Sequence, residues 1–327
     1  MPDTRSDGAL ALPDLNTIRA AHLRIAAHVQ RTPVLTCRAL DAAVGASLYF
    51  KCENFQRIGA FKARGAVNAV FSLSDAEAAN GVVTHSSGNH GAALAYAASR
   101  RGIRAHVVMP EDSARVKIDN VGALGATVHL CAPNVAAREV MCNQVLRDTG
   151  ATLVHPFDNV DVIAGQGTAA VELLEDADTL DVIITPVGGG GLLSGTAIAA
   201  RSIRPAIRLY GAEPANADDA QRGFRSGRVE PVAPTRTIAD GLRSTVSART
   251  LAAIRANVAG IATASEDAIV RAMRMTWEKM KIVIEPSAAV PLACLLERSI
   301  DVDGARVGVI LSGGNVDLDR LPWQPTP

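Results

Sequence analysis

Lys62 stands among apolar residues at the expected start of a helix, within the string FKARGA of residues 61–66. A lysine in a partly desolvated pocket has a lowered pKa and becomes an amine nucleophile that can form a Schiff base with an aldehyde. A surface-exposed lysine fits the same pattern. The sequence therefore presents Lys62 as a candidate nucleophile and leaves both interpretations open.

Two other segments offer groups that bind anions. Gly188–Gly191 follow an apolar run and precede an expected helix, where bare backbone N–H groups form a phosphate cradle, although a tight turn also needs glycine. Residues 86–91 (SSGNHG) combine hydroxyl, amide and N–H groups that suit a carboxylate or a ring oxygen; an ordinary N-cap turn is the alternative. No nucleoside-triphosphate loop and no dinucleotide fingerprint is present, which disfavours a Rossmann dehydrogenase.

The elements that must position these groups alternate along the chain. The spacing of apolar residues predicts helices at 15–30, 62–73, 92–101 and 192–201, and strands at 48–52, 82–85, 105–109, 127–131, 181–187, 207–211 and 307–311. Strands followed by short turns and helices predict a mostly parallel α/β sheet covered on both faces. Ligands of such sheets bind beyond the carboxyl ends of the strands, where residues 86–91, 188–191 and 312–315 are expected. The Arg-, Gly- and Pro-rich stretch 222–236 is predicted to be a surface excursion.

Composition limits the class of protein. The chain has 327 residues, enough for two domains, and its 33 Lys and Arg balance its 33 Asp and Glu. This balance argues against a nucleic-acid partner. The five cysteines are scattered without a C-x-x-C pair, which argues against a disulfide framework or a zinc site. No signal peptide or membrane span is recognisable, so we expect a cytoplasmic protein.

Several motifs in order resemble the fold-type II pyridoxal-phosphate enzymes. They are residues 61–66, 87–91, 188–191 and 312–315, with the longer strings 155–156, 162–168 (VIAGQGT), 212–219, 237–241 and 284–287. Within these enzymes the chain is similar to the serine racemase and serine/threonine dehydratase group, which includes 3-hydroxyaspartate ammonia-lyases. The likeness runs from about Ile18 to Leu321.

The resemblance implies an architecture. It predicts a two-domain α/β fold like that of the tryptophan synthase β chain, with mostly parallel twisted sheets flanked by helices. A large domain that binds pyridoxal 5′-phosphate is expected from residues 1–75 and 155–327, and a small mobile domain from 76–154. The resemblance also implies a homodimer. The family's nucleotide-activation site is matched only through Lys281 and Asn315, and Ala92 replaces a polar residue, so a nucleotide effector stays open.

The resemblance assigns roles around the cofactor. Lys62 should carry pyridoxal phosphate and move the Cα proton, and Phe61 should pack against the pyridine ring. Asn89 should hydrogen-bond the ring oxygen and Ser312 should meet the ring nitrogen. The phosphate should be held by the glycine loop, which comprises Gly188, Gly189, Gly190 and Gly191.

It also assigns residues to the substrate. The substrate carboxylate should be received by Ser86, Gly88, Asn89 and His90. Ser87 matches the residue that returns a proton from the opposite face in the racemases, which makes it a second catalytic candidate. Arg138 and Ser244 match positions near the substrate side chain.

A divalent-metal site is implied at Glu213, Asp219 and the carbonyl of Ala217. Hard oxygen ligands suit Mg²⁺ or Ca²⁺, with Mn²⁺ as a further choice. Without the resemblance, Asp218-Asp219 would be interpreted as a solvated loop.

The predicted activity is α,β-elimination from a β-hydroxy amino acid, namely L-serine, L-threonine or 3-hydroxyaspartate, to a 2-oxo acid and ammonia. Phe157 and Asp158 follow Pro156 here, as in microbial dehydratases, whereas animal serine racemases carry an asparagine directly after that proline. A serine racemase with secondary dehydratase activity stays an alternative. A non-catalytic protein that binds an amino acid or pyridoxal phosphate is a third.

Overall fold

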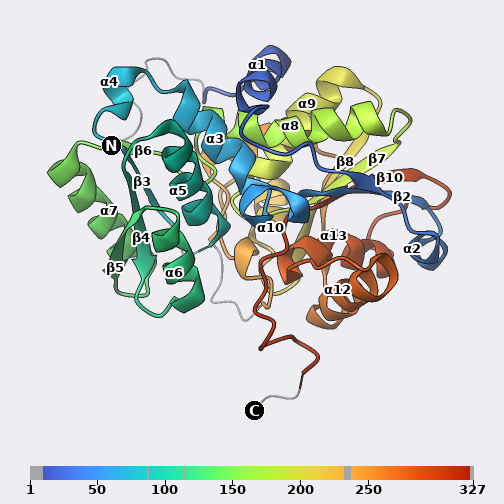
Figure 1. Cartoon of the computed structure of the whole chain (residues 1–327). Coiled ribbons are helices and arrows are strands. Elements are labelled where there is room, and N and C mark those ends of the chain that lie inside the picture. The colour runs from blue at the N-terminus through green and yellow to red at the C-terminus, as the bar shows by residue number, and fades with distance from the viewer. Residues whose placement is uncertain (1–9, 87, 114, 232–236, 325–327) are drawn as a thin grey trace.

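The computed structural model describes residues 10–86, 88–113, 115–231 and 237–324. Within these ranges the chain forms a six-stranded and a four-stranded sheet, which lie on opposite sides of the view in Figure 1. In spatial order the larger sheet contains β1 (Val34–Leu35), β2 (Ser47–Cys52), β10 (Arg306–Leu311), β7 (Val182–Pro186), β8 (Arg208–Pro214) and β9 (Gly260–Ala264). The smaller one contains β5 (Thr127–Cys131), β4 (Ala105–Pro110), β3 (Val82–His85) and β6 (Thr152–Leu153).

All strand pairs in both sheets are parallel except β1 with β2. Strand β2 pairs along its whole length with β10, from Ser47 opposite Arg306 to Cys52 opposite Leu311. Near-continuous apolar runs such as Val182–Ile184 are buried because both faces of the larger sheet are covered. The prediction of mostly parallel sheets flanked by helices is confirmed.

Helices cover both faces of the six-stranded sheet. One core packs α2 (Arg38–Val44), α12 (Glu266–Met280) and α13 (Pro286–Leu296) against it. The core on the other face includes residues of α8 (Val160–Asp176), α9 (Gly191–Ile203), α10 (Asp219–Ser226) and α11 (Ala248–Asn257). Helix α1 (Leu15–Ile25) packs mainly on α8, and Met273 of α12 lies in the first core.

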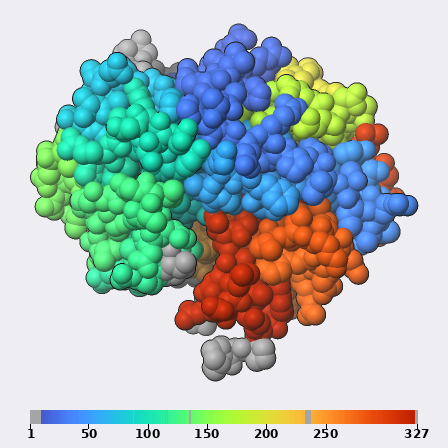
Figure 2. Space-filling view, viewed as in Figure 1, coloured from blue at the N-terminus to red at the C-terminus, as the bar shows by residue number. Residues whose placement is uncertain are grey.

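The four-stranded sheet has its own two layers. Helix α7 (Val135–Thr149) covers one face, and α5 (Asn89–Arg101) with α6 (Arg115–Ala123) covers the other. Helix α3 (Lys62–Ser72) packs against both α5 and α8, and the short α4 (Asp75–Ala78) follows it. In Figure 2 the segment that carries this sheet, coloured green to teal, forms one side of the visible face.

The strands predicted at 82–85 and 127–131 have those bounds in the structure. The surface excursion predicted at 222–236 is wrong at its start, because residues 222–226 belong to α10, whose Gly223 is buried. Residues 232–236 lie outside the described ranges. Among the described helices, none combines the length and apolar character needed to cross a membrane.

Candidate active site

Lys62 is the first residue of α3, and its amine is enclosed by protein. The Nζ atom donates a hydrogen bond to the carbonyl oxygen of Pro156 at 2.9 Å and lies 5.2 Å from the centre of the Phe61 ring. Part of the side chain stays accessible, yet burial of the amine lowers the pKa of Lys62 to about 8. This is the environment that makes a lysine nucleophilic.

The turn that presents the Pro156 carbonyl is built by His155. The backbone N–H groups of Asp158 and Phe157 donate to His155 Nδ1 at 2.9 and 3.4 Å, so the ring proton lies on Nε2. Burial, with the neighbouring charges of His85 and Lys62, lowers the pKa of His155 to about 3. These bonds order the chain between β6 and α8, and the imidazole next to Lys62 is uncharged.

The segment after β3 approaches Lys62 from the smaller sheet. His90 is buried and its Nε2 lies 3.2 Å from the carbonyl oxygen of Val154; burial and the Lys62 charge lower the pKa of His90. The N–H of Gly88 donates to Ser86 Oγ at 3.3 Å, just before α5 begins. Ser87 lies outside the described residues.

Asn89 begins α5 and joins the two sheets. Its Nδ2 donates to both carboxyl oxygens of Glu285 at 3.1 Å, and its Oδ1 accepts from Asn315 Nδ2 at 2.9 Å. Burial raises the pKa of Glu285 to about 7. No role was predicted for Glu285, although the string at 284–287 pointed to its surroundings.

The glycine loop lies between β7 and α9, as expected. Gly190 has φ of +86°, and a Cβ added to Gly189 would lie 2.1 Å from the Phe157 ring, so both positions favour glycine. The Thr250 hydroxyl donates to the Gly189 carbonyl at 2.9 Å and fixes the loop against α11. Because α9 starts at Gly191, this loop presents its N–H groups at a positive helix end, which fits a phosphate.

Ser312 follows β10, is 2% exposed, and accepts a hydrogen bond at its carbonyl oxygen from the N–H of Phe61 at 3.0 Å. A backbone bridge between Ala60 and Gly313 adds to this contact. Residues 61–62 and 312–313 therefore meet in space although they lie near opposite ends of the chain, which brings two of the predicted motifs together.

The chain matches the family model described as "Pyridoxal-phosphate dependent enzyme" over residues 25–313. It belongs to that family. The chain is 48% identical over 312 residues to the beta-hydroxyaspartate dehydratase of Paracoccus denitrificans, covering 95% of this chain and 99% of the other. It is 49% identical over 316 residues to the serine racemase of Dictyostelium discoideum, covering 95% and 98%. The solved structure of maize serine racemase superposes with a TM-score of 0.92 at 44% identity, covering 94% and 95%.

As a member of the pyridoxal-phosphate dependent enzymes, the chain uses pyridoxal 5′-phosphate, and the geometry fits this group. The enclosed amine of Lys62 suits an aldehyde, and the glycine loop suits a phosphate. The predicted assignment to the serine racemase and dehydratase group within this family is confirmed.

Arg138 and Ser244, the two residues predicted near the substrate side chain, lie in different parts of the fold. The charge of Arg138, on α7, helps to lower the pKa of His85 at the end of β3, after the larger effect of burial, so the two side chains are near each other. Ser244 is exposed on the loop between the 3₁₀ helix Asp240–Leu242 and α11.

Glu213 and Asp219 form a buried acidic pair at the end of β8. Glu213 accepts from the N–H groups of Ala220 and Gln221 at 3.1 and 2.8 Å. Both carboxyl oxygens of Asp219 are buried without a hydrogen-bond partner among the described residues, and burial raises its pKa to about 6. Burial and Asp219 likewise raise the pKa of Glu213. No described group of three or more His, Cys, Asp or Glu is placed to hold a metal, so backbone oxygens would have to complete a site.

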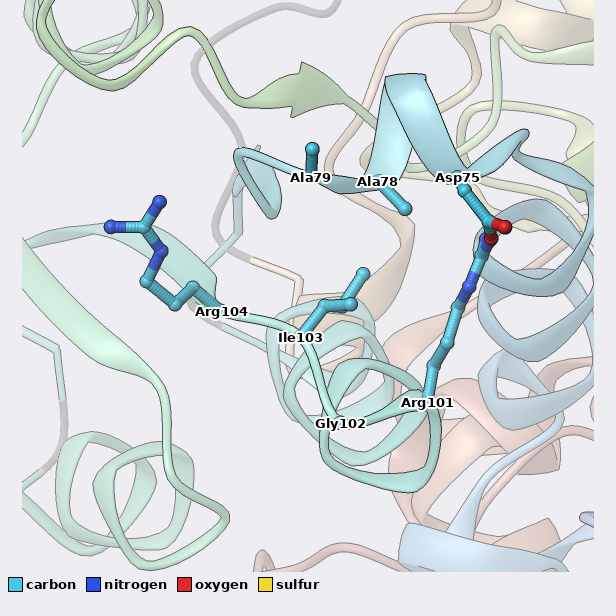
Figure 3. A pocket seen from close by; sticks show the side chains of 7 residues that line it. All are labelled: Asp75, Ala78, Ala79, Arg101, Gly102, Ile103 and Arg104. Carbon is cyan, nitrogen blue, oxygen red and sulfur yellow. The ribbon is translucent and has the colours of Figure 1, made fainter.

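A separate hollow of about 300 Å³ lies between α4 and the end of α5 (Figure 3). Asp75 and Arg101 meet across it at 3.3 Å, while Arg104 points away. None of the predicted site residues lines it.

Proposed function

We propose that the protein is an ammonia-lyase that converts a β-hydroxy amino acid to a 2-oxo acid and ammonia, with 3-hydroxyaspartate, L-serine and L-threonine as candidate substrates. The observation that carries this proposal is the enclosed Lys62 amine, held 2.9 Å from the Pro156 carbonyl with its pKa lowered to about 8. The similarity to a beta-hydroxyaspartate dehydratase supports this reaction class.

Lys62 would hold pyridoxal phosphate through its amine, with Phe61 against the ring and Asn89 and Ser312 at its polar atoms. The glycine loop would hold the phosphate through N–H groups. The bound cofactor supplies the electron sink for charge that develops at the substrate Cα. A neutral Ser312 hydroxyl at the ring nitrogen would strengthen that sink little, which favours rapid loss of a β-hydroxyl group.

Lys62 would also act as the general base. With its pKa near 8, an appreciable fraction of the amine is unprotonated near neutral pH and can accept the Cα proton. The uncharged imidazoles of His90 and His155 help, because they add no positive charge of their own to the pocket. Ser86, Gly88, Asn89 and His90 would receive the substrate carboxylate.

Racemisation of serine is the second candidate function, favoured by the 49% identity to a serine racemase. In this reaction the Cα proton would be returned from the opposite face, a role we propose for Ser87. The branch between the two reactions depends on whether the β-hydroxyl leaves before a proton returns.

A divalent cation, Mg²⁺, Ca²⁺ or Mn²⁺, would bind Glu213, Asp219 and the Ala217 carbonyl. The support is the unpartnered buried carboxylate of Asp219, since a buried charge without a partner is costly. Hard oxygen ligands match these metals.

We further propose a large domain of residues 1–75 and 155–327 and a small mobile domain of 76–154, each built around one of the two sheets. A cytoplasmic homodimer completes this proposal. Nucleotide binding near Lys281 and Asn315 stays a hypothesis. Asn315 bonds Asn89 at 2.9 Å, so a nucleotide bound there would be linked to the active site through this hydrogen bond.

The test is incubation of the protein with pyridoxal phosphate, Mg²⁺ and each of L-serine, L-threonine, D-serine and the two diastereomers of L-3-hydroxyaspartate. Release of 2-oxo acid that disappears in Lys62→Ala supports the lyase and names its substrate. Conversion of L- to D-serine faster than oxo-acid release identifies a racemase. A protein that binds cofactor yet performs neither reaction contradicts the proposed substrate class.

A further inference from the structure

Arg64, two residues after Lys62, belongs to a cluster of buried charged side chains that reaches α8 through Glu172. Lys51, Glu53 and Arg64 are 0% exposed and Glu172 is 2% exposed. Two cations and two carboxylates make the cluster neutral. Such burial is costly unless every charge is paired with good geometry, so the contacts within it decide what it does.

Arg64 is the centre of the cluster, because its guanidinium hydrogen-bonds two carboxylates. Its Nε and one terminal nitrogen donate to the two oxygens of Glu53 at 2.7 and 2.8 Å. Its two terminal nitrogens donate to the two oxygens of Glu172 at 2.8 and 2.7 Å. These paired contacts fix the orientation of a guanidinium as well as its position.

The remaining acceptors of the cluster are also occupied. Lys51 donates to Glu172 and to the Thr32 carbonyl, each at 2.7 Å, and the Thr32 hydroxyl donates to Glu53 at 2.5 Å. Burial alone would raise the pKa of Glu172, but Arg64 and Lys51 outweigh it and lower that pKa. The carboxylate of Glu172 is therefore held ionised within the protein.

This cluster bears on Lys62 because Arg64 lies in the same first turn of α3. Phe61, at the N-cap position, makes no side-chain capping bond, so the usual anchor for a helix start is missing. The turn is held instead by Arg64, joined to α8 through Glu172 and to the residues after β2 through Glu53, and by the N–H of Gly65, which donates to Gln166 at 3.1 Å.

We propose that Arg64 is a positioning residue for Lys62, whose two carboxylate contacts lock the first turn of α3 so that the amine stays enclosed beside the Pro156 carbonyl. This inference rests on the proposed role of Lys62 as the residue that carries the cofactor. Arg64 touches no reacting atom and acts only through the helix that it shares with Lys62.

Arg64→Lys tests this proposal, because lysine keeps the charge and loses the planar fork. The first readout needs no cofactor: the reaction of the Lys62 amine with an acylating reagent is followed against pH in the apo-protein by mass spectrometry. The wild type should give a midpoint near pH 8. In Arg64→Lys the loosened turn should let water reach the amine. Hydration favours the charged amine, so the midpoint should rise by about one pH unit. In the loaded protein, kcat should fall roughly tenfold or more with little change in KM, as for a displaced base.

Two controls separate positioning from general stability. Lys51→Met removes another buried cation of the cluster that is not on α3; it should lower the melting temperature and leave the Lys62 midpoint near 8. Arg31→Ala breaks two largely exposed ion pairs, with Glu175 and Asp176 of α8, and should change neither midpoint nor activity.

A lowered melting temperature in Arg64→Lys with wild-type midpoint and kcat, measured well below unfolding, overturns the inference. An equal displacement of the midpoint in Lys51→Met overturns it too. Oxo-acid release that persists in Lys62→Ala would instead contradict the proposed function, so the two failures are distinguishable.

Discussion

Helix α3 has two buried faces that make different kinds of contact. Toward α8 it makes directed contacts: Arg64 pairs with Glu172, Gly65 bonds Gln166, and Asn68 donates to the Asp161 carbonyl. Toward α5 the contact is mainly apolar, with side chains such as Val67, Val70, Leu94, Ala97 and Ala98, and one hydrogen bond runs from Arg101 to the Val70 carbonyl at the far end of the helix.

The difference matters for the site between the two sheets. Ion pairs, hydrogen bonds and close glycine contacts permit one arrangement of two helices, whereas apolar side chains tolerate small sliding movements. We therefore expect the face that carries Lys62 to be fixed to α8, and the α5 side, which carries the expected substrate residues, to be the more adjustable of the two. Among the described residues, the polar links between the two sides include Asn89 with Glu285, Asn89 with Asn315, Lys117 with Asp240, and Tyr96 with the His28 carbonyl.

The largest effect is expected from Gly165→Ala on α8. A Cβ at this position would lie 2.6 Å from the Arg64 carbonyl oxygen and 2.7 Å from the Gly65 Cα, and backbone cannot move aside as a side chain can. We expect a loss of about 3 kcal/mol in the free energy of unfolding, measured by urea denaturation.

Gly122→Ala on α6 is the matched control. A Cβ there meets nothing within 4 Å, and the position is helical, so alanine should stabilise by about 0.4–1 kcal/mol. A similar small effect in both variants would show that the directed face of α3 is not tightly constrained.

A comparable effect is expected from pH at Glu285. Its pKa is raised from 4.5 to about 7, so between these values the unfolded chain releases a proton that the folded protein keeps. The stability that this group contributes to the apo-protein should therefore be fully present below pH 4.5 and be lost as pH rises through 7. Within that window the free energy of unfolding should fall by about 1.4 kcal/mol for each unit by which the pH rises.

Glu285→Gln should flatten this decline in urea titrations across the same pH window in the presence of a chelator. Asp219, with its pKa raised to about 6, gives a similar slope in both proteins, so their difference isolates Glu285. Parallel curves for the two proteins would argue that Glu285 is ionised in the fold.

Arg138→Ala probes the side that we expect to be adjustable. If the Arg138 guanidinium near His85 binds the side-chain carboxylate of 3-hydroxyaspartate, kcat/KM for this substrate should fall about 100-fold in the variant. The value for L-serine, which lacks that carboxylate, should fall only a few-fold. Arg147→Ala, an exposed arginine on the same helix, should leave both values unchanged. Equal losses for both substrates would remove Arg138 from the choice of substrate.

The smallest effect is expected from Lys117→Ala. Lys117 bonds Asp240 at 2.7 Å, but the two side chains are 38% and 47% exposed, so the pair should contribute less than about 1 kcal/mol. We expect a KM change of a few-fold at most, which shrinks as salt is added. A large effect that persists in high salt would mean that this pair holds the two sides together.

Local patterns predicted much of the fold. The strands at 82–85 and 127–131 are correct to the residue, because their apolar runs end at turn-forming residues. Helix α5 was predicted to start at Ala92 but starts at Asn89, since the polar pair Asn89-His90 continues the helix toward the site. The motif resemblance identified Lys62, the glycine loop and Ser312, which the structure brings to the ends of their elements.

Contacts between distant positions were beyond sequence reasoning. Nothing in the spacing links Arg64 to Glu172, 108 positions away, or Asn89 to Glu285, 196 positions away, because such pairs depend on how helices pack. Glu285 in particular resembles any acidic residue before a helix-starting proline, and only its position against Asn89 gives it a role.

The pairing of β2 with β10 has a consequence for synthesis of the chain. Phe50 lies opposite Val309, so β2 lacks its partner in the centre of the larger sheet until β10 has been made. The smaller sheet is complete once Leu153 has appeared, since β6 pairs with β3. We therefore expect residues 82–153 to collapse early, while β2, already paired with β1, keeps its other edge open until β10 is made. This open edge should be the part of the larger sheet most vulnerable to aggregation during translation.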